Sequence, residues 1–262
     1  MQFKKILLFF LVALPLSVAL RFIQLTYIVE KSTGFFMQEF EMYGNYMLGV
    51  IFAFCLGVAI FAFFSHRSPE QPAEPNIVMS IAAVCFSFSI LYELAAEKFP
   101  AVVQGWQITL LNIFGVATAA YFVAFALKRF VNFPFPDMLS IIPTVYLVLR
   151  IICDFTAISS LALISDNLIL MASYSVSLLF MLNYAKLYNN AGGDYGSRKL
   201  MATGLAATIL CFTQAVPHIV VNLINDFGYL HTSMAANITV LFMGVFIAAF
   251  TFSHFSRKNS CE

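Results

Sequence analysis

The stretch Ile108–Phe130, ITLLNIFGVATAAYFVAFALKRF, is an apolar run that ends close to a pair of basic residues. A helix needs about 20 mostly apolar residues to cross the hydrocarbon core of a bilayer. Lysine and arginine gather on the cytoplasmic side of such helices. This stretch therefore predicts a transmembrane helix whose second end faces the cytoplasm.

Seven further runs of similar length accompany it. Of all 262 residues, 61% are hydrophobic and 10% are charged, which is far from the composition of a soluble globular domain. We therefore expect an all-α chain, a polytopic membrane bundle of eight transmembrane helices. The predicted spans lie near residues 6–28, 43–64, 76–94, 107–127, 138–159, 164–186, 200–222 and 233–255.

The first run has a second interpretation. Lys4 and Lys5 precede its apolar part, as the basic residues of a secretory signal peptide do. No convincing small-residue cleavage site follows Leu20, so we favour a retained helix.

Basic residues set the expected orientation, independently of hydropathy. Eight spans place both termini on one side, and a cytoplasmic location of the termini leaves only Lys31 and Lys98 in outer loops. The inner segments then hold Lys4, Lys5, Arg67, Lys128, Arg129, Lys186, Arg198, Lys199, Arg257 and Lys258. We therefore predict a multi-pass protein of the cell (plasma) membrane with both termini in the cytoplasm.

The opening stretch has a counterpart, ITVLFMGVFIAAFTFSHFSRK at Ile238–Lys258, which also ends in a basic pair. Three other pairs of runs align weakly in the same order. In one of them, a proline precedes Arg21 in the first run and Arg150 in the fifth. Two apolar helices can align by chance, but four ordered pairs favour an internal duplication. We expect two parallel four-helix repeats, residues 1–131 and 132–262, within one integral membrane domain.

Ionisable residues inside spans are costly, so they normally face the bundle interior, a partner or water. The stretch VYLVLRIICDFTA, Val145–Ala157, places Arg150 and Asp154 four residues apart on one helix face. In the predicted orientation such residues concentrate in the outer half of the membrane. We expect an outward-facing polar pocket there. Its predicted binding residues are Arg21, Gln24, Glu93, Arg150, Asp154, Gln214 and His218.

Within this set, Asp154 is the sharper candidate for function. Arg150 aligns with Arg21 in the predicted repeat, whereas Asp154 aligns with Leu25 and has no polar counterpart. We therefore interpret the arginine as a feature that both halves inherited. The aspartate is then an addition to the second half alone.

Arginines and carboxylates together suit a protein that binds or transports a small polar or anionic solute. The alternative is a membrane subunit or sensor that acts through a partner protein, in which these polar residues only join helices by hydrogen bonds. An intramembrane enzyme would have to use His218 as its base. No nucleophile or metal motif accompanies this histidine, so we expect no enzyme.

The remaining expectations concern partners. A formal net charge of +1 gives no reason to expect nucleic-acid binding, and no pattern indicates a cofactor or a metal ion. The expected surroundings are the lipid bilayer. Glycines such as Gly44, Gly49 and Gly57 permit close helix packing, and with it a homodimer or a larger membrane complex.

Overall fold

A computed structural model describes residues 2–30, 34–65, 75–97, 99–100, 102–131, 136–158, 165–189, 191, 196–224 and 232–256. Its helices are α1 (Gln2–Ile23), α2 (Glu41–Ser65), α3 (Ile77–Ala96), α4 (Gly105–Leu127), α5 (Ile142–Ile158), α6 (Ser165–Tyr188), α7 (Gly196–Ile224) and α8 (Met234–Ser256). A π-helical turn, Gln24–Ile28, extends α1, and a 3-10 turn, Asp137–Ile141, leads into α5. Among the described residues, eight helices are long and apolar enough to cross a membrane. The predicted all-helical fold is therefore confirmed, and the helix lengths and composition fit a multi-pass membrane protein.

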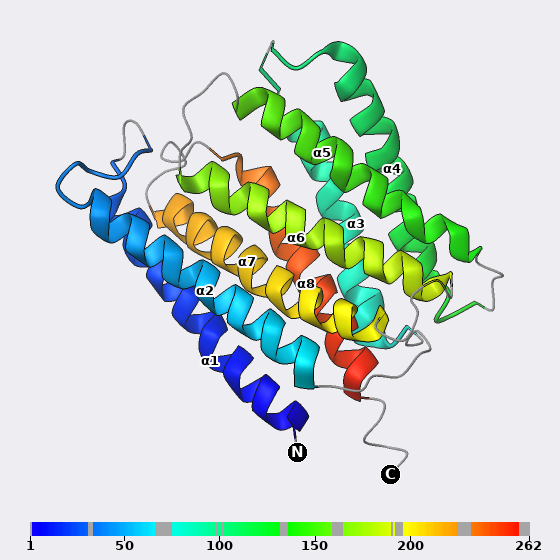
Figure 1. The fold of residues 1–262 in the computed structure, drawn as a ribbon. Helices are drawn as coiled ribbons and strands as arrows, with labels where there is room; N and C mark the ends of the chain where they lie inside the picture. Colours follow the sequence, from blue (N-terminus) through cyan, green and yellow to red (C-terminus); the bar gives the residue numbers. More distant parts are fainter. Residues whose placement is uncertain are drawn as a thin grey trace.

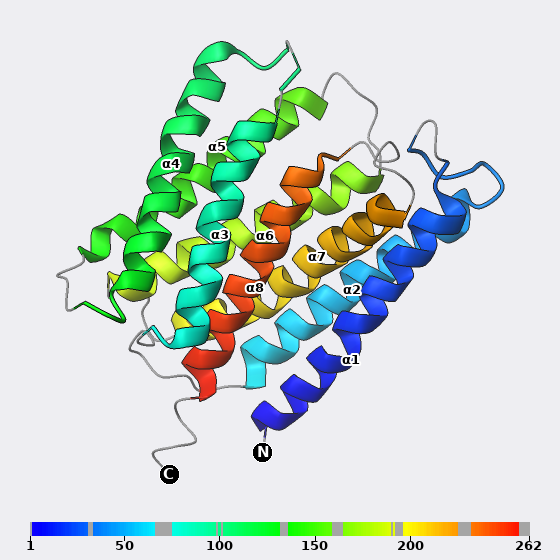
Figure 2. The ribbon, with the colours of Figure 1, turned by 180° about the vertical axis from the view of Figure 1, so that it is seen from behind.

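The helices form one bundle, with α1 and α2 along one edge and α4 and α5 along the opposite edge (Figure 1). Helix α7 lies between them and packs against α1, α2, α6 and α8. Helix α3 packs against α4 and α8, and α5 packs against α4 and α6. The start of α1 and the end of α8 lie at the same end of the bundle (Figures 1 and 2). We call this the terminal end, and the opposite one the distal end.

Burial separates the central helix from the edge helices. The most apolar part of α7 is 78% buried, whereas that of α2 is 22% buried. The exposed side chains of α2 are largely apolar, as the lipid-facing side of a membrane helix requires. Helix α7 is therefore the structural axis of the bundle.

Small residues allow α7 and α8 to approach closely. A Cβ atom added to Gly244 of α8 would lie 2.7 Å from Cβ of Cys211 on α7, closer than such atoms normally come. Membrane helices associate largely through this kind of tight packing, because lipid supplies no hydrophobic driving force between them. By contrast, a Cβ on Gly49 of α2 would meet nothing within 4 Å.

The connection between α1 and α2 folds back over the distal end. Val29 and Phe36 form an isolated antiparallel bridge, and Gly34 between them adopts a φ of 75°, which favours glycine. Phe36 then lies against Gly44 of α2, where an added Cβ would come within 2.8 Å of the ring. This packing fixes the position of the loop beside the first turns of α2 and α6.

Candidate functional site: two ionic clusters and a pocket at the distal end

Most of the buried charged and amide side chains lie toward the distal end of the bundle, whereas the buried His254 lies near the terminal end. The distal residues lie on the last turns of α1, α3, α5 and α7, and on the first turns of α6 and α8. The fully or almost fully buried members are Arg21, Gln24, Glu93, Arg150, Asp154, Asp166, Gln214, His218, Asn222 and Asn237. Apart from Asn222, they belong to two separate ionic clusters and one amide pair.

The first cluster, which we call the closed cluster, consists of Arg21, Gln24, Asp166 and His218. Arg21 of α1 forms an ion pair with Asp166 of α6, and both side chains are fully buried. The Nη1 atom of Arg21 donates to Oε1 of Gln24 over 3.0 Å. Nε2 of His218, on α7, lies 3.4 Å from Oδ2 of Asp166. The closed cluster thus joins three helices with one arginine matched to one carboxylate.

Local backbone structure places these groups. Helix α6 begins at Ser165, so Asp166 lies in the first turn, where the helix dipole favours a negative charge. The π-helical turn begins at Gln24, directly after the turn that holds Arg21. Nε2 of Gln24 donates to the carbonyl oxygen of Gly44 over 2.9 Å, which fastens the end of α1 to α2. The cluster therefore also anchors the α1–α2 corner.

His218 faces hydrogen-bond acceptors with both ring nitrogens. Nδ1 lies 2.7 Å from the carbonyl oxygen of Gln214, and a carbonyl oxygen can only accept. Nδ1 must therefore carry a proton, and Nε2 then meets the Asp166 carboxylate. The ring therefore donates to the Gln214 carbonyl oxygen and presents Nε2 to the buried carboxylate.

The second cluster, which we call the open cluster, consists of Glu93, Glu97, Arg150 and Asp154. Nε of Arg150 donates to Oδ2 of Asp154 over 3.0 Å, and Nη1 lies 3.1 Å from Oε1 of Glu93. The Nη1 and Nη2 atoms of Arg150 also donate to the two carboxylate oxygens of Glu97, and the distance from Nη2 to Oε1 is 2.7 Å. One arginine of α5 therefore meets three carboxylates, one from α3, one from the residue directly after α3 and one from α5.

Exposure changes across the open cluster. The exposed fraction of the side chain is 16% for Glu97, 9% for Asp154, 2% for Arg150 and zero for Glu93. The cluster thus reaches from the edge of the bundle into its interior. Two more carboxylates than guanidinium groups meet here, so full ionisation would leave an excess of buried negative charge, which is costly. A proton or a bound cationic group would offset it.

Aromatic side chains enclose the inner part of the open cluster. The hydroxyls of Tyr146 and Tyr174 donate to the two carboxylate oxygens of Glu93 over 3.5 and 3.4 Å. The rings of Phe99 and Tyr174 lie 5.3 and 5.6 Å from Cζ of Arg150, within range of a cation–π interaction. Helix α6 thus contacts both clusters, because Asp166 belongs to the closed cluster and Tyr174 packs against the open cluster.

The seven residues proposed from the sequence are therefore divided among three places. Arg21, Gln24 and His218 meet in the closed cluster, and Glu93, Arg150 and Asp154 meet in the open cluster. The side chain of Gln214 belongs to neither and instead donates to Oδ1 of Asn237 over 3.3 Å. The predicted binding set did not include Glu97, Asp166, Tyr146, Tyr174 and Asn237. Two of these had a readable signal, because Glu97 is four residues after Glu93 and Asp166 opens an apolar run.

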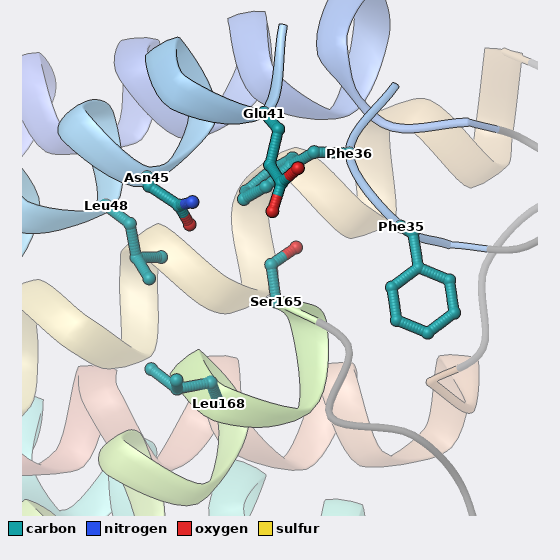
Figure 3. Close-up of a pocket in the computed structure, with 7 residues that line it drawn as sticks. All are labelled: Phe35, Phe36, Glu41, Asn45, Leu48, Ser165 and Leu168. Carbon is teal, nitrogen blue, oxygen red and sulfur yellow. The ribbon is translucent and has the colours of Figure 1, made fainter. Parts of the chain in front are cut away.

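A pocket of about 340 Å³ opens at the distal end beside the closed cluster. It lies between the α1–α2 connection, the first turns of α2 and the start of α6 (Figure 3). Its lining consists of Phe35, Phe36, Glu41, Asn45, Leu48, Ser165 and Leu168. None of the seven predicted binding residues is among them.

Within the described part of the chain, no group of three or more histidine, cysteine, aspartate or glutamate side chains could hold a metal ion. No family model, curated protein or solved structure matches the chain. The case for a function therefore depends on the geometry of the two clusters and the pocket.

Proposed function

We propose that the protein binds, or carries across the membrane, a small polar solute that enters the bundle at the distal end. The open cluster holds the positively charged group of this solute. The single observation behind the proposal is the surplus of carboxylates around Arg150, with Glu97 and Asp154 at the accessible edge. An ammonium or guanidinium group of the solute would compensate the excess negative charge of these carboxylates.

An anionic solute, which two arginines would suit, has less support from this geometry. Both guanidinium groups already contact carboxylates, Arg21 with Asp166 and Arg150 with three acids. An anion would have to displace one of these carboxylates and leave it buried without its partner.

Transport would also require a change of shape, because the half of the bundle nearer the terminal end is packed with aromatic rings. The ring centroids of Phe122 and Phe246 lie 4.8 Å apart, and those of Tyr184 and Phe250 lie 4.9 Å apart. The Tyr121 and Tyr184 hydroxyls bond each other over 2.7 Å. These contacts would have to separate for a solute to pass.

The second candidate is a subunit or sensor that acts through a partner protein. The closed cluster favours it, because a buried one-to-one ion pair between α1 and α6 fits a purely structural contact between helices. We do not propose an enzyme. Among the described contacts of His218 are an acid and a carbonyl oxygen, but no serine, threonine or cysteine that it could activate.

A binding and uptake assay separates the two candidates. Purified protein is screened by thermal shift against amines, amino acids and organic anions, and the best binder is then offered as a radiolabelled solute to proteoliposomes. We expect a cationic or zwitterionic binder, with affinity reduced at least tenfold in Glu97→Gln, because a bond to a charged group contributes about 1.5–3 kcal/mol. The matched control is Glu39→Gln, an exposed acid at the same end. If no compound binds and a partner co-purifies instead, the subunit or sensor replaces the solute-binding protein.

We further propose that both termini are cytoplasmic, that the membrane is the plasma membrane, and that the chain is a duplication of four helices. The distribution of lysine and arginine supports the orientation, and the four ordered pairs of runs support the duplication. The boundary between the proposed repeats adjoins residues 132–135, which lie outside the described residues. Reporter fusions after Lys128 and after residue 100, active on opposite sides of the membrane, test the orientation.

A further inference from the structure

The pocket beside the closed cluster is a second place where a ligand fits. It shares no residue with the open cluster, so its interpretation does not depend on the proposed function. Glu41 and Ser165, which line it, are the first residues of two membrane-length helices, α2 and α6. The pocket therefore lies at the level where the hydrocarbon core meets the headgroup region.

The polar part of the lining is rich in hydrogen-bond acceptors. Figure 3 shows the carboxylate of Glu41 and the hydroxyl of Ser165 directed toward one another across the pocket. Oγ of Ser165 is buried and, among the described residues, has no hydrogen-bond partner. Asn45 adds a side-chain amide on the same side as Glu41. An ionised carboxylate accepts only, so a ligand here must bring donors.

The apolar part of the lining fits the same kind of ligand. Phe35 and Phe36 bring two aromatic rings, whose faces attract cations, and Leu48 and Leu168 close the opposite side. The described stretch 34–45 contains Glu39 and Glu41 and no basic residue. Within this described stretch, the charges thus favour a cationic ligand over an anionic one.

We propose that this pocket binds a primary ammonium group, presented either by an aminophospholipid headgroup or by a free small amine. An ammonium with three N–H donors can meet Glu41, Asn45 and Ser165 together, whereas a quaternary ammonium has no N–H to give them. A volume of about 340 Å³ admits a headgroup-sized molecule.

Native mass spectrometry of the full chain tests the proposal with defined probes. The lipid arm compares short-chain phosphatidylethanolamine with phosphatidylcholine and phosphatidylglycerol of the same chain length, and the soluble arm uses ethanolamine. We expect phosphatidylethanolamine or ethanolamine to bind at least about tenfold more tightly than the probes without a primary amine. Binding in the lipid arm alone assigns the site to a headgroup, and binding of ethanolamine assigns it to a free amine.

Variants locate the binding. Glu41→Gln and Ser165→Ala should each remove the preference for the primary amine, while Glu39→Gln, which does not line the pocket, should retain it. Glu41 is exposed at a helix end, so its substitution leaves the fold intact. If Glu41→Gln lowers the yield of folded protein, the Ser165→Ala variant alone tests the proposal. Equal binding of all probes, or a preference that survives both variants, would overturn the proposal.

Discussion

The closed and open clusters have similar components but opposite balances. In the closed cluster, one arginine meets one aspartate, and both side chains are fully buried. In the open cluster, one arginine meets three carboxylates, and exposure rises to 16% at Glu97. A matched pair without access to water can hold helices together but leaves no place for another charge. An unmatched set at an accessible edge leaves such a place, so the same residue types produce two different electrostatic environments.

The largest effect is expected from breaking the matched pair. Arg21→Ala leaves Asp166 buried without its guanidinium and should lower the free energy of unfolding by about 3–5 kcal/mol. Denaturant titration in detergent, followed by circular dichroism, measures the loss. The double variant Arg21→Met with Asp166→Leu removes both charges and should recover most of the stability. A loss below about 1 kcal/mol for Arg21→Ala would mean that the buried ion pair does not stabilise the contact between α1 and α6.

A smaller loss is expected at His218. His218→Leu removes the donor to the Gln214 carbonyl and the contact with Asp166, and should cost about 1–3 kcal/mol. His218→Gln retains an N–H donor and should lose less. The same denaturant titration compares the two variants. Equal losses would show that the size of the side chain, and not its hydrogen bond, matters at this position.

Accessibility separates the clusters without a stability measurement. In a background with its cysteines replaced, Glu97→Cys should react with a membrane-impermeant maleimide at least about tenfold faster than Gln24→Cys, because only the former position is partly exposed. Reaction rates are measured on reconstituted vesicles with the distal end outward. Similar rates at both positions would remove the distinction between an open and a closed cluster.

The sequence predicted most of this fold, because a membrane-spanning helix requires a long apolar run and no long-range information. It also placed the polar residues at one end, since their depth follows from helix rise alone. It did not predict their partners. Arg150 and Asp154 were recognisable as a pair on one helix, but the contacts of Arg150 with Glu93, and of Arg21 with Asp166, join helices far apart in the sequence. Such contacts depend on how helices rotate and cross, which is decided by packing contacts such as that of Gly244 with Cys211.

The smallest change in the free energy of unfolding is expected for Glu97→Gln, and this variant also tests the excess of carboxylates in the open cluster most directly. Glu97→Gln removes one of three carboxylates around Arg150 at the most exposed position, so repulsion within the cluster falls while Glu93 and Asp154 still contact the arginine. The free energy of unfolding should therefore change by no more than about 1 kcal/mol, as for other partly exposed ion pairs. Asp166→Asn in the closed cluster is the matched change and should cost more, because Arg21 would lose its charged partner. A larger loss for Glu97→Gln than for Asp166→Asn would reverse the assignment and make the Arg150 cluster the structural one.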